Sequence, residues 1–108
     1  GEISGNITIM CELVVFLNSF WSKYSVANDA NETEERERSL VLSSIMRIMC
    51  QIISKMPFED VPTATVQSVL QIAFKQATES IKLAESDYVL CDYSLTYLSC
   101  LSRVMASV

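Results

Sequence analysis

The chain has 108 residues, half of them hydrophobic, and a formal net charge of −5. This length suits a single domain, and the acidic balance argues against nucleic-acid binding, which needs clustered Lys and Arg. Histidine is absent and glycine occurs only at Gly1 and Gly5, so the commonest general base and any glycine-rich phosphate loop are missing. We therefore expect no catalytic residues, no metal, no cofactor, no small-molecule substrate and no nucleic-acid partner.

The first predicted helix runs from about Asn6 to Val26. Its segment Ile7–Trp21 is apolar nearly all round, with Glu12 as the only charge. Such a helix is buried on all sides or lies in a membrane, but this one is short for a membrane span and carries Asn18. We expect a core or interface helix. Because a small domain cannot bury so much apolar surface alone, the simplest partner is a second copy of the chain.

The segment Ala27–Glu37 is polar and acidic, which predicts a solvated loop that ends in the charged first turn of a second helix. That helix is expected from about Arg36 to Lys55, where polar residues recur at spacings of three and four. Pro57 ends it, because proline cannot continue a helix.

A third helix is expected over about residues 63–85, with one apolar and one polar face. Ser86 or Asp87 is a plausible N-cap for the last helical region, which is predicted as a short turn over 88–92 followed by a helix over 94–107. The predicted fold class is all-α: a bundle of four or five helices with short connections.

Four cysteines, an even number, fit an oxidising compartment and allow three full intrachain pairings. The alternative is that each is a small buried hydrophobe. Two glycosylation sequons, at Asn6 and Asn31, favour secretion into the extracellular space. We expect at least one disulfide. On one continuous helix, Cys91 and Cys100 would lie about half a turn out of phase. We therefore expect each of them to pair with a cysteine of the first or second helix. The candidates are Cys11, Cys50, Cys91 and Cys100.

Glu12 and Arg47 are the only charges deep inside the first two predicted helices. An unpaired buried charge is very unfavourable, so the two could form a buried ion pair. The alternative is that each side chain reaches solvent at the bundle surface.

The second half of the chain resembles a known family. From Met56 it reads MPFEDVPTATVQSVLQIAFKQATESIKLAES, followed by YVLCDYSLTYLSCLSRVMASV. This pattern resembles the carboxy-terminal domain of spider silk proteins, the spidroins, and it covers about residues 36–108. The matching positions are Pro57, Val66, Gln67, Leu70, Ile72 and Tyr97. The first helix matches only in length and apolar character.

The chain departs from the family pattern at several positions. The usual family cysteine aligns with Pro62, which puts the interchain disulfide of the family in doubt here. The buried family glutamate aligns with Gln71. These departures indicate a divergent member, of a glue or attachment silk. The resemblance implies a secreted homodimer that joins two long silk chains, keeps them soluble in storage and controls their assembly.

The resemblance also suggests where a dimer face could lie, on the apolar side of the third predicted helix. The small side chains of Ala73 and Ala77 would let two helix backbones approach closely. The alternative is that this stripe forms the core of a single chain. The predicted face comprises Val66, Val69, Leu70, Ala73, Phe74 and Ala77.

Other interpretations stay open. The segments Phe16–Phe20 and Leu70–Phe74 also suit the spidroin amino-terminal domain, a helical bundle whose last helix would be missing here. A helical bundle that binds a membrane through its first helix, or a partner helix in a groove, is a further alternative. Light scattering of the purified chain, with and without reductant, distinguishes a self-associating domain from these.

Overall fold

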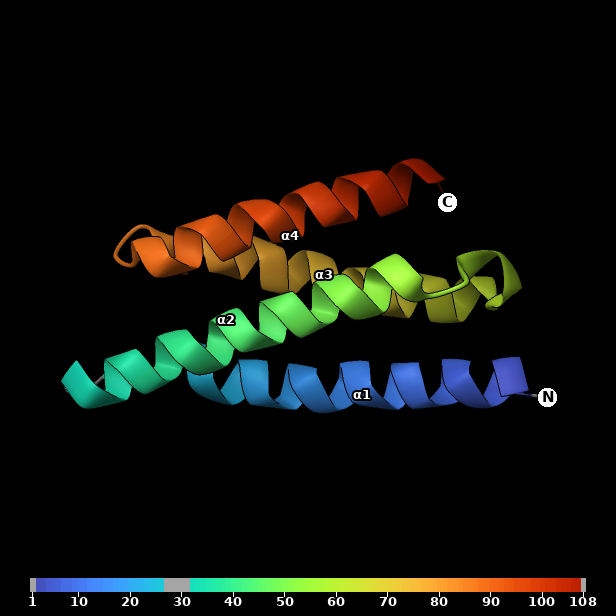
Figure 1. Cartoon of the computed structure of the whole chain (residues 1–108), viewed down its shortest axis with the longest axis horizontal. Coiled ribbons are helices and arrows are strands. Elements are labelled where there is room, and N and C mark those ends of the chain that lie inside the picture. The colour runs from blue at the N-terminus through green and yellow to red at the C-terminus, as the bar shows by residue number, and fades with distance from the viewer. Residues whose placement is uncertain (1, 27–31, 108) are drawn as a thin grey trace.

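In a computed structural model, the described parts of the chain, residues 2–26 and 32–107, form a bundle of four α-helices (Figure 1). Side chains are described for residues 6–26 and 34–107. The predicted all-α class is therefore confirmed. The helices are α1 (Glu2–Ser25), α2 (Glu32–Lys55), α3 (Thr63–Ala84) and α4 (Tyr88–Ser107), with a short 3₁₀ helix η1 (Phe58–Asp60) between α2 and α3.

Three predicted boundaries are wrong. Helix α1 begins at Glu2 rather than near Asn6. Helix α2 begins at Glu32 rather than near Arg36, because glutamates are good helix formers and suit the positive N-terminal end of a helix. The expected loop over 27–31 lies outside the described residues. Helix α4 is continuous from Tyr88, because Asp87 caps it: the Val89 N–H donates to Asp87 Oδ1 at 3.0 Å. Asp87 is thus the predicted N-cap, and its other oxygen accepts a hydrogen bond from Ser39 of α2.

The bundle is elongated, with extents of 47 × 24 × 18 Å. Helices α1 and α4 both pack against α2 and α3, and they lie at opposite edges of the molecule in Figure 1. The most extensive packing joins α4 to α2 and to α3. Helix α1 therefore has one face toward the bundle and a long free face away from it.

A single hydrophobic core runs between the helices. Its largest wholly buried side chains include Trp21 of α1, Met46 and Met49 of α2, and Leu90 and Tyr97 of α4. Full burial of one such side chain contributes roughly 1.5–3 kcal/mol. Between α2 and α3 the chain turns at Pro57 and passes through η1, which is followed by the buried residue Val61.

Candidate functional site

The apolar stripe of α3 does not lie on a free surface. Val66, Val69, Ala73 and Ala77 are buried in the core of this one chain. Leu70 is half-buried, and Phe74 alone of the six predicted interface residues is well exposed. The second interpretation of this stripe, as the chain's own core, therefore applies to four of the six. Those four side chains are not accessible to a second copy.

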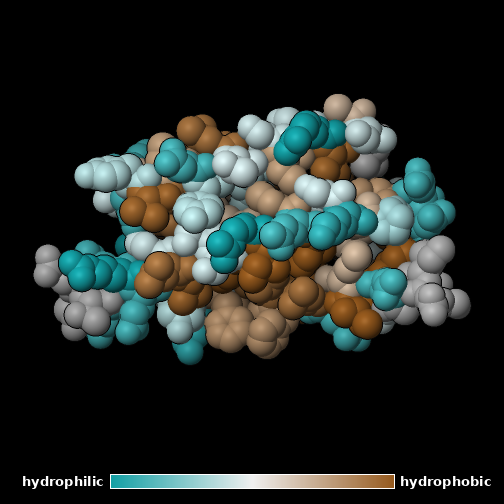
Figure 2. Space-filling model, in the orientation of Figure 1, coloured by the Kyte–Doolittle hydropathy of each residue, from teal (hydrophilic) through white to brown (hydrophobic). Residues whose placement is uncertain are grey.

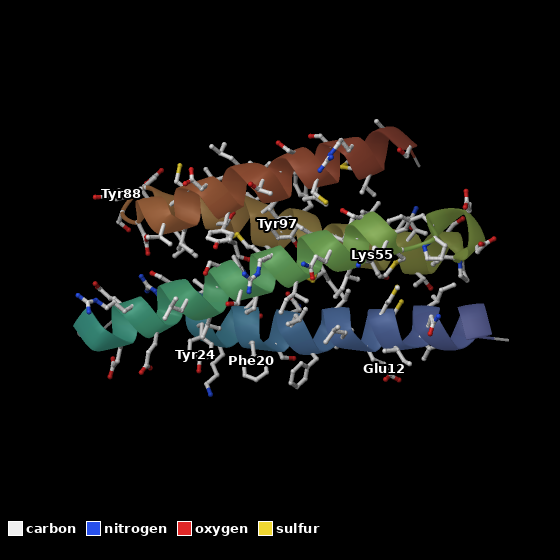
Figure 3. All side chains as sticks on the ribbon, viewed as in Figure 1. Glu12, Phe20, Tyr24, Lys55, Tyr88 and Tyr97 are labelled. Carbon is white, nitrogen blue, oxygen red and sulfur yellow. The ribbon has the colours of Figure 1, made fainter. Side chains whose placement is uncertain are left out.

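A continuous row of apolar side chains lies instead on α1. Ile9, Leu13 and Phe16 are exposed, and Phe20 and Tyr24 are half-buried. Their spacings of four, three, four and four residues place all five on one side of the helix. We call these five residues the outer stripe. In Figure 3, Phe20 and Tyr24 lie on the side of α1 turned away from α2, and both pack partly against the core. Figure 2 shows apolar atoms gathered along the α1 edge.

Aromatic contacts organise the outer stripe along the helix. The rings of Phe16 and Phe20 meet edge to face with centroids 5.0 Å apart. Phe20 stacks on Tyr24 at 6.4 Å, and Lys23 Nζ lies 5.7 Å from the Tyr24 ring centroid. Such contacts hold aromatic side chains in place. Because the rings are already ordered, little side-chain entropy is left to lose when a partner covers them.

A neighbouring face of α1, about a quarter of a turn round the helix from the outer stripe, supplies its share of the core. Val14, Leu17 and Trp21 are buried there. Helix α1 is therefore apolar on two faces, of which the bundle covers one. The sequence carried this signal in the nearly all-apolar segment Ile7–Trp21, but periodicity alone did not show which face would stay free.

The expected buried ion pair is not formed. Glu12 and Arg47 are both exposed, and the Glu12 side chain points away from the bundle in Figure 3. The prediction of burial is wrong, because each charge reaches water at the surface and avoids the loss of solvation that burial would require.

A buried polar network connects three helices instead. Gln76 of α3 donates through Nε2 to Asn18 Oδ1 of α1 at 3.1 Å. Tyr97 of α4 donates through its hydroxyl to Gln76 Oε1 at 2.8 Å. Gln76 and Tyr97 are wholly buried, and burial raises the pKa of the Tyr97 hydroxyl. Sequence reasoning missed Gln76, although its position three residues after Ala73 places it on the buried side of α3.

The four cysteines are free thiols, and the fold brings two of them together. Cys100 of α4 faces Cys50 of α2 and donates to its carbonyl oxygen, with sulfur and oxygen 3.6 Å apart. Burial raises the pKa of the Cys50 thiol to about 12, and the neighbouring Cys100 adds to this, while Arg103 acts in the opposite direction. The predicted disulfide between a cysteine of the last helix and one of the first two helices stays a prediction, because all four thiols are free here.

Within residues 2–26 and 32–107, no cluster of three or more His, Cys, Asp or Glu side chains is placed to hold a metal ion. None of the helices in these ranges is both long and apolar enough to cross a membrane. No known protein family, no curated protein and no solved structure matches the chain.

Proposed function

We propose that this chain is a non-catalytic self-association domain that pairs with a second copy through the outer stripe of α1. We further propose that it is a terminal assembly domain of a secreted silk or silk-glue protein. The outer stripe supports the first statement, and the spidroin-like pattern over about residues 36–108 supports the second. The amino-terminal type of spidroin domain, the alternative assignment, implies the same class of function.

The exposure of the outer stripe is the observation that carries the proposal. Ile9 and Phe16 expose 62% and 58% of their surface, and Leu13 lies between them on the same face. Soluble monomers rarely expose a continuous apolar patch of large size, and such patches mark interaction sites. A stable interface buries on the order of 1,000 Å² or more in total, and a helix of 24 residues, about 36 Å long, is long enough to supply much of it.

The charges beside the stripe favour a second copy in antiparallel orientation. Glu12 and Lys23 are the charged residues on α1 between Asn6 and Ser25. An antiparallel crossing centred between Leu17 and Asn18 sets Glu12 of one copy opposite Lys23 of the other, and twofold symmetry repeats the contact. A parallel pairing would set like charges against each other, which opposes association.

Two phenylalanines of equal exposure give a matched test. Phe16 on α1 and Phe74 on α3 are each 58% exposed. Light scattering should show a dimer for the wild-type chain and for Phe74→Asp, and a monomer for Phe16→Asp at the same micromolar concentration. Circular dichroism checks that both variants remain helical. A monomeric wild-type chain, or a dimer that only Phe74→Asp dissociates, would contradict the proposed face.

The silk assignment needs a separate test. The domain would be fused to a soluble repetitive silk segment, and the fusion compared with the repetitive segment alone and with the Phe16→Asp fusion. We expect the wild-type domain to double the mass of the fusion and to keep it in solution at higher concentration. If the fusion dimerises without any change in solubility or fibre formation, the result supports self-association and contradicts the silk function.

A further inference from the structure

The contact between Cys50 and Cys100 joins the two most extensively packed helices, α2 and α4. Cys100 is buried, and its sulfur lies within hydrogen-bond distance of the Cys50 carbonyl oxygen. Its other neighbour is the hydroxyl of Ser54, with oxygen and sulfur 3.2 Å apart. Burial and the interaction with Cys100 both raise the pKa of the Cys50 thiol, so the two cysteines are neighbours across the helix interface.

A surface pocket of about 600 Å³ leads to one of the two thiols. Its walls include Cys100, Ser54 and Arg103, whereas Cys50 does not line it. The pocket is large enough to admit part of a small organic molecule, and the Arg103 guanidinium suits a carboxylate on that molecule. Cys50 is half-buried and lies outside this pocket, so a reagent held in the pocket lies beside Cys100.

We propose that Cys50 and Cys100 form a thiol–disulfide exchange site that reacts with a small carboxylate-bearing disulfide of the oxidised glutathione type and closes an intrachain bond between α2 and α4. This inference is independent of the proposed self-association, because neither cysteine belongs to the outer stripe of α1.

The reaction proceeds in two exchanges. The Cys100 thiolate attacks one sulfur of the reagent, the reagent S–S bond breaks, and one small thiolate leaves while a mixed disulfide forms on Cys100. The Cys50 thiolate then attacks the Cys100 sulfur, forms the Cys50–Cys100 bond and releases the second small thiolate. The two protons lost by the cysteines are taken up by the two leaving thiolates. Two protein thiols are oxidised and one reagent disulfide is reduced to two thiols.

Two consequences follow from the geometry. The second attack is the slow step at neutral pH, because burial raises the pKa of Cys50 and keeps its thiol protonated. The new bond closes a loop of about 50 residues, which in the chain-entropy model lowers the unfolding equilibrium constant by about a thousandfold. Oxidation therefore stabilises the folded chain without adding a subunit.

Peptide mapping tests the site directly. The reduced wild-type chain is incubated with oxidised glutathione, alkylated and digested with trypsin. Cleavage after Lys and Arg places Cys50 in peptide 48–55, Cys91 and Cys100 in peptide 83–103, and Cys11 in peptide 1–23. We expect a cross-link between peptides 48–55 and 83–103 within one chain, and a shift of the urea midpoint to higher concentration. Chymotryptic cleavage at Tyr93 and Tyr97 then assigns the bond to Cys100 rather than Cys91.

Single-cysteine variants complete the test. The cross-link should persist in Cys91→Ser and Cys11→Ser and disappear in Cys100→Ser. Loss of the cross-link in Cys91→Ser, a bond between two chains on a non-reducing gel, or four free thiols in the wild-type chain after prolonged oxidation would each overturn the proposal. The mapping of the wild-type chain decides the matter even if a cysteine variant does not fold.

Discussion

Helices α1 and α3 both pack against α2 and have similar lengths, yet they use their apolar residues differently. In α3 most of the apolar stripe is buried, because neighbours on two sides, α1 and α4, cover it. In α1 the bundle buries the face with Val14, Leu17 and Trp21, whereas Phe20 and Tyr24 of the outer stripe are only half-buried and its other three residues stay exposed. The difference shows that a helix at the edge of a bundle can carry a second apolar face that the other three described helices leave largely uncovered.

The two helices also differ in their buried polar groups. Helix α3 carries Gln76 and Ser80 on its buried side, and both are hydrogen-bonded: Ser80 to Ser94 of α4 at 2.8 Å, and Gln76 to side chains of α1 and α4. Helix α1 contributes only Asn18 to this network. Buried polar groups with their partners present help to fix one arrangement of neighbouring helices, so these bonds help to define how α3 lies against α1 and α4.

The largest effect on the free energy of unfolding is expected on the inner face of α1, which carries Val14, Leu17 and Trp21. Trp21→Ala removes a side chain that is 1% exposed and should lower the free energy of unfolding by about 3–5 kcal/mol. Phe74→Ala, on the exposed face of α3, is the control and should change it by less than about 1 kcal/mol. Urea denaturation followed by circular dichroism measures both. Similar values for the two variants would mean that the inner face of α1 does not hold the core.

The next largest effect on the free energy of unfolding is expected on the buried side of α3. Gln76→Leu leaves Tyr97 and Asn18 without their partner, which should lower the free energy of unfolding by about 1–3 kcal/mol. Gln71→Leu, at an exposed position of the same helix, should change it by less than about 0.5 kcal/mol. Thermal melts of the two variants give the comparison. A Gln76→Leu variant as stable as Gln71→Leu would show that the network adds no stability.

A smaller effect tests the orientation of the outer stripe. Glu12→Lys alone, or Lys23→Glu alone, should weaken self-association by about 0.5–1 kcal/mol, a few-fold in the dissociation constant. The double variant with both charges exchanged should recover the wild-type constant, because opposite charges face each other again. Sedimentation equilibrium at low salt measures all four chains. Additive losses in the double variant would exclude the antiparallel arrangement.

The smallest effect concerns alkaline pH. Burial raises the pKa of Cys50 from 9.0 to about 12, so the unfolded chain loses this proton at lower pH than the folded chain does. The resulting stabilisation is fully present below pH 9 and is lost as the pH rises from about 9 to 12. Tyr97, whose pKa is also raised by burial, adds to the loss above pH 10. In Cys50→Ser the free energy of unfolding should fall less steeply over this pH range than in the wild-type chain. An equally steep fall would show that other groups cause the loss of stability.

Much of the fold follows from local features of the sequence. Polar residues at helical spacing define the course of α2, Pro57 and Pro62 bracket the break before α3, and Asp87 caps α4 as its side chain and position suggest. Helix formation and capping depend on residues within about one turn of each other, which is why these features can be recognised without knowledge of the neighbours. The excess of apolar surface on α1 is likewise visible in the sequence.

Which faces meet was decided only by the tertiary structure. Periodicity shows that a helix has an apolar stripe, but the direction in which that stripe points depends on helices far away in the chain. For this reason Val66, Val69, Ala73 and Ala77 could be assigned to a dimer face from the sequence and yet lie in the core. For the same reason Gln76 could not be matched to Tyr97, nor Cys50 to Cys100, before the packing of α2, α3 and α4 was known. Glu12 and Arg47 lie at the surface because water solvates each charge better than the core would.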